Sequence, residues 1–266
     1  MASWEFPRTE PIELRVQIAA GSVRINAEPT DAVRLSIDAD SRDGSADDVR
    51  VNYADGRLQV TEPKSVGLFR HRRALDVQVT VPVGSDCAVH TASADVRCHG
   101  EPGRVDIHTV SGDVSVPTVR MPSEIHTASG DVSIGNADAT VTAYTASGQI
   151  HVARASADVT ATSASGDISI DGAAASVAAR TASGEITVTG AARGQVEANS
   201  VSGDITVKVA HGTGVYLELS SLSGEVTSDL EPLPESSGQA DLRVTCHSMS
   251  GDVRVARSAQ APMTAR

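Results

Sequence analysis

Thr109-Val110-Ser111-Gly112-Asp113-Val114-Ser115-Val116 is the stretch that decides the fold, because close variants of it recur along the chain. The central serines are 18 residues apart from Ser93 to Ser183, and the spacing then lengthens. A fixed period of this kind is typical of stacked-repeat proteins, in which each repeat buries its apolar face only against its neighbours. The further copies occupy residues 127–134, 145–152, 163–170, 181–188, 200–207, 221–228 and 248–255, and a copy without glycine lies at 91–98.

Aligned at 18 residues, the repeats place residues of one type in columns. Two columns are aliphatic and begin at Val114 and Val116, one contains Thr or Ser and begins at Thr109, and two contain alanine and begin at Ala137 and Ala143. The serine of each Ser-Gly-Asp step forms another column. These positions share strand parity, so we expect all of them to point inward. The alanine and threonine columns predict a thin interior.

Each repeat must turn back at corners to return above its start, since 18 residues of extended chain span roughly 60 Å. Ser-Gly-Asp predicts one corner, because glycine adopts positive φ without steric penalty and serine can bond to nearby backbone. We therefore predict an all-β fold, a parallel β-solenoid (β-helix) of about 18-residue rungs with two or three parallel faces per turn. A left-handed β-helix of hexapeptides also fits the length, but the aliphatic residues do not recur every six positions. The glycines assigned to these structural turns are Gly112, Gly130, Gly148, Gly166, Gly184, Gly203, Gly224 and Gly251.

The first 86 residues alternate apolar and polar side chains with the period of a β-strand. Asp55-Gly56 lies between two alternating runs and predicts a hairpin. Gly21 and Gly56 each precede alternating aliphatic residues, as the later glycines do, so we expect irregular rungs to begin near residue 12. A separate β domain over residues 1–86 is the alternative.

This organisation predicts a single β-solenoid domain over residues 1–257. Its parts are an irregular portion at 1–86, regular repeats at 87–228, and a proline-rich insertion followed by the last rung at 229–257. Residues 258–266 are predicted to be a disordered tail.

Composition disfavours some functions. A net charge of −12 disfavours nucleic acid, and 2% aromatic residues leave few stacking platforms for single strands or sugars. No signal-like amino terminus and no 18-residue apolar run occur, which predicts a cytoplasmic protein. Cys87, Cys98 and Cys246 lack metal-ligand spacing and are expected to be reduced packing residues.

Three side-chain clusters are candidates for a site. His90, His108 and His126 are 18 residues apart and face outward by parity, beside Asp106 and Glu124, so they could share a soft divalent metal. Exposed histidines without a ligand are the alternative.

An acidic column follows the corner glycines, and a solvated corner or a calcium site would account for it. The third cluster is a basic loop, where an anionic partner, an anionic membrane surface or the acidic column of a second copy could dock unless the loop is simply solvated. The loop residues are Leu68, Phe69, Arg70, Arg72 and Arg73.

The chain resembles the putative-adhesin β-strand-repeat proteins of unknown function that are common in actinobacteria. The resemblance rests on the Ser-Gly-Asp rungs and on Glu10-Pro11-Ile12, the Gly21 to Ile25 step, Thr30-Asp31, Tyr53 to Leu58 and Leu68-Phe69. It implies a β-solenoid, usually cytosolic in this short form, with envelope-associated or envelope-stress relatives and no established catalytic residue. Arg70-His71-Arg72-Arg73 stands where relatives often have glycines.

We expect a non-enzymatic scaffold or protein-interaction module that binds itself or another protein and uses no cofactor. The sequence contains no nucleophile elbow, phosphate-cradling loop, zinc-hydrolase helix or Rossmann turn, and no small-molecule substrate is evident. A polysaccharide-active or metal-binding β-helix protein is the alternative. Trp4 and Phe6 are expected to cover the first rung or to anchor a partner, and the insertion at 229–239 to cap the other end.

Overall fold

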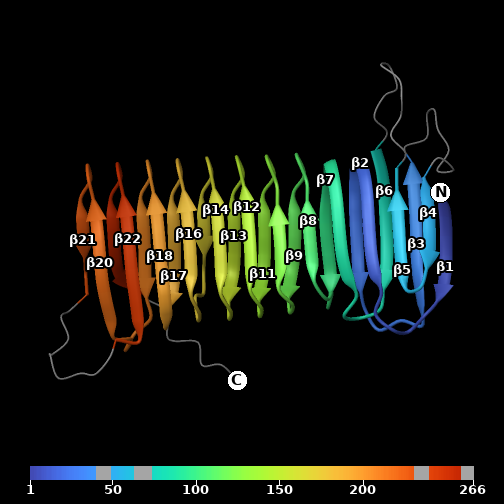
Figure 1. Cartoon of the computed structure of the whole chain (residues 1–266). Helices are drawn as coiled ribbons and strands as arrows, with labels where there is room; N and C mark the ends of the chain where they lie inside the picture. Colours follow the sequence, from blue (N-terminus) through green and yellow to red (C-terminus); the bar gives the residue numbers. More distant parts are fainter. Residues whose placement is uncertain (40–48, 63–73, 231–239, 259–266) are drawn as a thin grey trace, which may run out of the picture. The chain divides into compact units, whose positions relative to one another are not determined.

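The computed structural model describes residues 1–39, 49–62, 74–230 and 240–258, and these residues form 23 strands and no helix (Figure 1). The chain divides into two compact units, Met1–Ser133 and Ile134–Arg266. In each unit, parallel strands stack in register as successive rungs of a solenoid. The predicted all-β parallel β-solenoid is confirmed.

Ten strands lie within the first unit, and β11 (Val132–Ala137) contains the division. The rungs begin with β2, which pairs in parallel with β7 on one side and with β5 and β6 on the other. The expected start near residue 12 is therefore confirmed. The strands are β1 (Ala2–Pro7), β2 (Glu13–Ala27), β3 (Ala32–Ala39), β4 (Arg50–Ala54), β5 (Arg57–Thr61), β6 (Ala74–Val81), β7 (Asp86–Gly100), β8 (Val105–His108), β9 (Val114–Val119) and β10 (Ser123–His126).

Only one of the two early glycines occupies the corner position of the repeat. Gly21 lies beside Ala94 in the register of β2 and β7, as the repeat predicts. Gly56 instead forms the two-residue loop of the β4–β5 hairpin with Asp55, and their φ values are 75° and 50°. The hairpin prediction is confirmed, and the interpretation of Gly56 as a rung glycine is wrong, because a hairpin of this loop length needs positive φ at both residues.

Antiparallel strands cover the amino-terminal end of the first unit. β3 pairs antiparallel with β6, and β1 pairs antiparallel with β3. Phe6 on β1 stacks on Tyr53 of β4 with ring centroids 4.4 Å apart, and the Trp4 side chain is half-buried. Phe6 thus packs on the β4–β5 hairpin, and the alternative role of Trp4 and Phe6 as an anchor for a partner stays a prediction.

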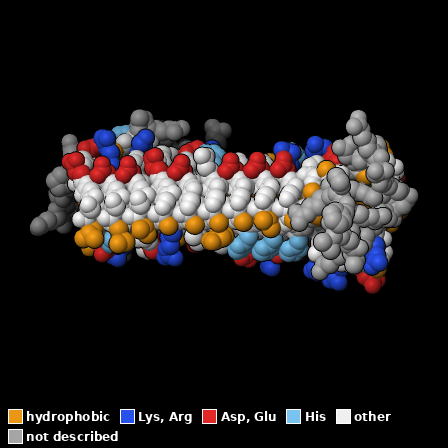
Figure 2. All heavy atoms as spheres, turned by 90° about the horizontal axis from the view of Figure 1, so that it is seen from above, with side chains coloured by type: hydrophobic (Ala, Val, Ile, Leu, Met, Phe, Trp, Pro, Cys, Tyr) orange, Lys and Arg blue, Asp and Glu red, His pale blue; other side chains and the backbone are white. Residues whose placement is uncertain are grey.

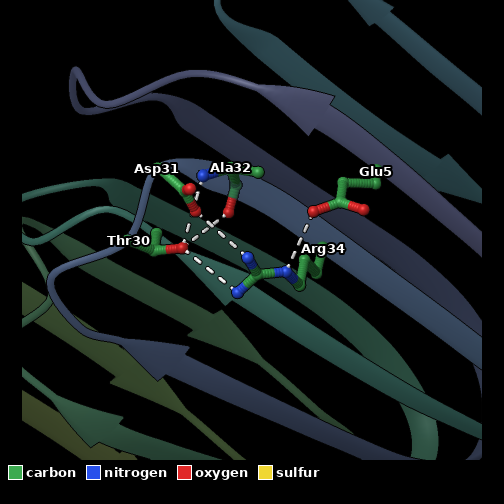
Figure 3. A network of polar contacts seen from close by, with 5 residues as sticks. All are labelled: Glu5, Thr30, Asp31, Ala32 and Arg34. Carbon is green, nitrogen blue, oxygen red and sulfur yellow. Dashed lines mark hydrogen bonds and ion pairs between the residues drawn. The ribbon is translucent and has the colours of Figure 1, made fainter.

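Arg34 joins β1 to the turn before β3 (Figure 3). Its guanidinium donates to the Glu5 carboxylate at 3.1 Å and to the Asp31 carboxylate at 3.1 Å. The Thr30 hydroxyl donates to the Ala32 carbonyl at 2.9 Å within the same turn. These groups are exposed, so each pair contributes little stability, but together they fix the register of the covering strand.

The second unit has two strands per rung and therefore two parallel faces. One face contains β12, β14, β16, β18, β22 and β20, and the other contains β13, β15, β17, β19, β23 and β21. The strands are β12 (Val141–Thr145), β13 (Ile150–Ala155), β14 (Val159–Ser163), β15 (Ile168–Ile170), β16 (Val177–Thr181), β17 (Ile186–Ala191), β18 (Gly194–Ser200), β19 (Ile205–Val209), β20 (Val215–Ser221), β21 (Val226–Ser228), β22 (Leu242–Ser248) and β23 (Val253–Arg257).

The last repeat in the sequence is not the last rung in space. β22 pairs with β18 on one side and with β20 on the other, and β23 likewise lies between β19 and β21 (Figure 1). The rung at 215–228 is therefore the outermost one. The chain then turns back, and residues 242–257 form the rung between 215–228 and 194–209. The last rung predicted at 229–257 is therefore not the outermost one, because the link between the two repeats is long enough to allow a return.

The interior matches the predicted columns, with one exception. The aliphatic columns from Val114 and Val116, the alanine columns and the Thr/Ser column from Thr109 are buried. The serines of Ser-Gly-Asp are exposed, for example Ser111 and Ser165, so their predicted inward orientation is wrong. β8 ends at His108 and β9 starts at Val114, and the chain between them turns, so strand parity does not continue through the corner.

The corner glycines are structural, but for another reason than the expected one. None of the eight is among the described glycines with positive φ. For seven of them, a Cβ would lie well inside the 3.0 Å that real Cβ atoms keep from other heavy atoms, against a backbone carbonyl of the adjacent rung. For Gly166 that carbonyl belongs to Gly148, and for Gly184 it belongs to Gly166. The corner needs glycine because adjacent rungs approach too closely for a side chain.

Buried hydroxyls satisfy the backbone at these corners. Thr127 accepts a hydrogen bond from the Gly130 N–H at 3.0 Å, and Ser163 donates to the Gly148 carbonyl at 3.3 Å. A hydroxyl can both donate and accept a hydrogen bond, so Thr or Ser can bond to a backbone N–H or to a backbone carbonyl. These groups are buried and cannot bond to water instead. This explains why an otherwise apolar interior contains a Thr/Ser column.

A matched pair of glycine substitutions tests this explanation. Gly166→Ala should lower the free energy of unfolding by about 1–3 kcal/mol, because its methyl group would overlap the Gly148 carbonyl. Gly172→Ala in the same unit should cost less, because its Cβ would meet its nearest neighbour at 3.5 Å. Urea unfolding measures both, and equal losses would contradict the steric role of the corner.

Candidate functional site

Three columns follow one another across the Ser-Gly-Asp corner on the outside of both units. Acidic side chains form a row on one side of the small Ser and Gly residues, and apolar side chains form a row on the other side (Figure 2). The apolar row contains the residue before each serine, and its most exposed members are Val110, Val201, Met249 and Leu222, with 55%, 49%, 55% and 81% exposure.

The acidic row has a structural role that the sequence did not reveal. The Asp113 Oδ1 accepts a hydrogen bond from the Asp131 N–H at 3.0 Å, and the Asp167 Oδ1 accepts one from the Glu185 N–H at 2.9 Å. The same contact joins Asp204 to Asp252 at 2.8 Å. Each carboxylate thus bonds to the backbone of the next rung, and this bond offsets the repulsion between neighbouring carboxylates.

The three histidines lie side by side on the outer face of β7, β8 and β10. His90 and His108 stack with ring centroids 5.1 Å apart, and His108 and His126 with centroids 4.8 Å apart. His108 Nε2 lies 3.0 Å from the Asp106 carboxylate, and His126 Nε2 lies 2.5 Å from the Glu124 carboxylate. Hydrogen bonding to His126 lowers the pKa of the Glu124 carboxyl. The predicted outward column and its acidic neighbours are therefore present.

The orientation of these rings matters for metal binding. The ring planes are within 13° and 7° of parallel, so the nitrogens of neighbouring rings do not point at a common position. Zinc needs ligand nitrogens at about 2.0–2.1 Å, which requires at least two rings to turn. Within the described part of the chain, no group of three or more His, Cys, Asp or Glu residues is arranged to hold a metal ion.

The remaining sequence candidates do not add a site. The three cysteines are free and buried, and burial raises the pKa of Cys98 and of Cys246 to about 12. Such thiols are unreactive packing groups, as expected. Leu68, Phe69, Arg70, Arg72 and Arg73 lie outside the described residues, so their role as an interaction loop stays a prediction.

The end rung of the second unit, formed by β20 and β21, has an open edge. Among the described strands, β20 pairs only with β22, and β21 pairs only with β23. Val226 is 42% exposed, whereas Val253 and Ile205 in the same column are 0% exposed. Inward-facing residues of this rung therefore lack the cover that every inner rung receives.

Leucines occupy the interior positions of this open rung. Leu217 and Leu219 stand in register with Val244 and Cys246 of β22, which are fully buried, yet both leucines remain half-buried. On the outer face, the guanidinium of Arg243 lies over the Tyr216 ring, 4.9 Å from its centroid. We define the open end rung as residues 215–228. Sequence reasoning missed it because the order of the rungs cannot be taken from their order in the chain.

The sequence matches the model of the Toastrack DUF4097 family over residues 12–256, and the chain belongs to this family. The predicted recognition of a β-strand-repeat family is thereby confirmed. No curated protein matches the sequence. None of the described residues forms a helix that is long and apolar enough to cross a membrane.

Solved structures with the same kind of fold cover nearly the whole chain. A putative adhesin from Bacteroides fragilis is 15% identical, with 96% of each chain covered and a TM-score of 0.54. A putative lipid binding protein from Parabacteroides distasonis is 17% identical, with 96% of each chain covered and a TM-score of 0.48. At these identities the first likeness supports the fold alone.

The carboxylate ladder can be tested at one rung. Asp167→Ala removes the acceptor for the Glu185 N–H and should lower the free energy of unfolding by about 1–2 kcal/mol. Asp167→Asn keeps an oxygen acceptor at the same position and should cost less. If the two variants unfold at the same urea concentration, the carboxylate is only a solvated surface group.

The histidine column gives a second test at this site. If His90, His108 and His126 bind zinc after their rings turn, zinc should raise the melting temperature of the wild type and not of His108→Ala. His247→Ala is the control, because His247 is exposed on β22 in the second unit. Equal zinc shifts in all three proteins would end the metal hypothesis.

Proposed function

We propose that this protein is a non-enzymatic interaction module that pairs with a second copy of itself through the open end rung. The observation that carries the proposal is the edge of β20 that no described strand pairs with, beside half-buried Leu217 and Leu219. A strand edge with free backbone groups and apolar neighbours is a template for another strand. At the amino-terminal end, antiparallel strands cover the first rungs, so the strand edges there belong to β1 and β4 and not to a parallel rung.

A second copy of the chain fits this edge, because it supplies an identical β20 strand with the same free backbone groups and the same leucines. Two β20 strands related by a two-fold axis at Leu217 would pair antiparallel, with Tyr216 of one copy opposite Glu218 of the other. An axis at Glu218 would place two carboxylates opposite each other, which is unfavourable. The pairing at Leu217 would also continue the apolar interior from one copy into the other.

A putative adhesin among the structural neighbours supports an interaction role, because adhesion is a binding function. A link to envelope or stress functions and a cytoplasmic location stay predictions of the sequence. A polysaccharide-active or metal-binding protein remains the alternative, and the zinc experiment above separates its metal branch.

Light scattering across micromolar concentrations tests the proposal. The wild type should form a dimer at both low and high salt, because the contact is mainly apolar and backbone-mediated. Leu217→Lys should be monomeric, since it places a charge in the contact. Ser220→Lys, on the exposed outer face of the same strand, is the matched control and should dimerise as the wild type does.

Two outcomes contradict this assignment. A wild-type monomer at both salt concentrations would overturn self-association and leave another protein as the partner. A dimer that high salt dissociates would point to the basic loop at Arg70, Arg72 and Arg73 in place of the open end rung.

A further inference from the structure

A shallow groove of about 320 Å³ runs across four strands of the second unit. Each of β12, β14, β16 and β18 contributes one outward side chain to it, and these four residues are consecutive in register. Strands in a sheet are about 4.8 Å apart, so the groove extends over about 14 Å. The four side chains are Tyr144, Thr162, Arg180 and Asn199.

The opposite wall of the groove is the apolar row beside the Ser-Gly-Asp corner (Figure 2). It contains Ala164, Ala182 and Val201, and Val201 is 49% exposed. The Tyr144 ring, 41% exposed, adds an aromatic surface at one end. The groove therefore offers an apolar wall along its length and hydrogen-bonding groups along the other side.

The charge of Arg180 in the groove is paired with Glu197, which lies beside the groove lining. Arg180 donates to the Glu197 Oε1 at 2.7 Å, and the Asn199 amide donates to the same oxygen at 2.9 Å. The bond from Arg180, with a smaller contribution from Asn199, lowers the pKa of the Glu197 carboxyl. A free anion would meet the carboxylate and a free cation would meet the guanidinium, so the groove does not favour an ionic ligand.

The hydrogen-bonding groups that remain suit a hydroxyl-bearing ligand. Arg180 has five N–H donors and uses few of them on Glu197, Asn199 retains its carbonyl oxygen and a second amide hydrogen, and Thr162 supplies a hydroxyl. A ligand for this groove is elongated and uncharged, has hydroxyls along its edges and has apolar C–H faces. A neutral oligosaccharide has all four properties.

We propose that the groove formed by Tyr144, Thr162, Arg180 and Asn199 against Ala164, Ala182 and Val201 binds a neutral oligosaccharide. Tyr144 stacks on a sugar ring, and Arg180 and Asn199, held in place by Glu197, bond to its hydroxyls. The groove lies on the outer face of inner rungs, so this binding does not depend on the proposed pairing of the open end rung.

Titration of the full chain with maltotriose, cellotriose, chitotriose and xylotriose tests the proposal, with calorimetry and ligand-observed NMR as readouts. At least one trisaccharide should bind, and Tyr144→Ala and Asn199→Ala should weaken its affinity tenfold or more. His151→Ala is the control, because His151 is an exposed aromatic residue of the same unit that lies on β13, outside the groove. Its affinity should equal that of the wild type.

Melting temperatures of the variants confirm that each is folded before binding is compared. If none of the four sugars binds at about 10 mM, the proposal is overturned. A dissociation constant above that concentration corresponds to too little binding free energy for a specific site. Equal losses in Tyr144→Ala and His151→Ala would also overturn it. Preferential binding of trigalacturonic acid would overturn the neutral-ligand assignment, because that sugar is anionic.

Discussion

Close approach between adjacent rungs at the Ser-Gly-Asp corner is the constraint on which the rest of the structure depends. The carbonyl of one corner glycine occupies the space that a Cβ of the next would need, as for Gly148 and Gly166. At the Ser-Gly-Asp corners the rungs stack this closely because the position lacks a side chain. The buried hydroxyls and the acidic row then follow, because each supplies hydrogen bonds to the backbone that the close approach brings together.

Local patterns in the sequence predicted most of the fold. Aliphatic residues at a spacing of 18 identified the inward columns, and Asp55-Gly56 identified a hairpin, because both signals depend on residues that are near one another in sequence or period. The serine column was wrongly predicted to point inward. That prediction extended the in-and-out alternation of the strand past the end of the strand, into the corner. The reason predicted for the corner glycines, a positive φ, was also wrong. In a sequence, a glycine that is needed for close contact between rungs looks the same as a glycine that is needed for positive φ.

The order of the rungs was beyond the reach of the sequence for a physical reason. The repeat at 248–255 satisfies the corner constraint equally well beside Gly203 or beside Gly224, and in the structure its Gly251 lies between the two. All repeats are nearly equivalent as neighbours, so the lengths of the links decide which rung lies outermost. The candidate end rung therefore depends on a choice that neither periodicity nor composition encodes.

A solenoid of uniform rungs presents the same side chain many times, so its outer faces gain distinct chemistry where outward residues differ between rungs or where the stack ends. The rung from Thr181 to Ser200 is one residue longer than 18, and the pairing of β17 with β19 shifts register between Val188 and Ala191. In the same region the outward column changes from Tyr144 and Thr162 to Arg180 and Asn199, and these residues line the groove. The open end rung is likewise a break, since there the repeat stops. The open end rung thus lies where regular stacking stops, whereas the groove lies on four strands in continuous register and owes its chemistry to outward side chains that differ from rung to rung.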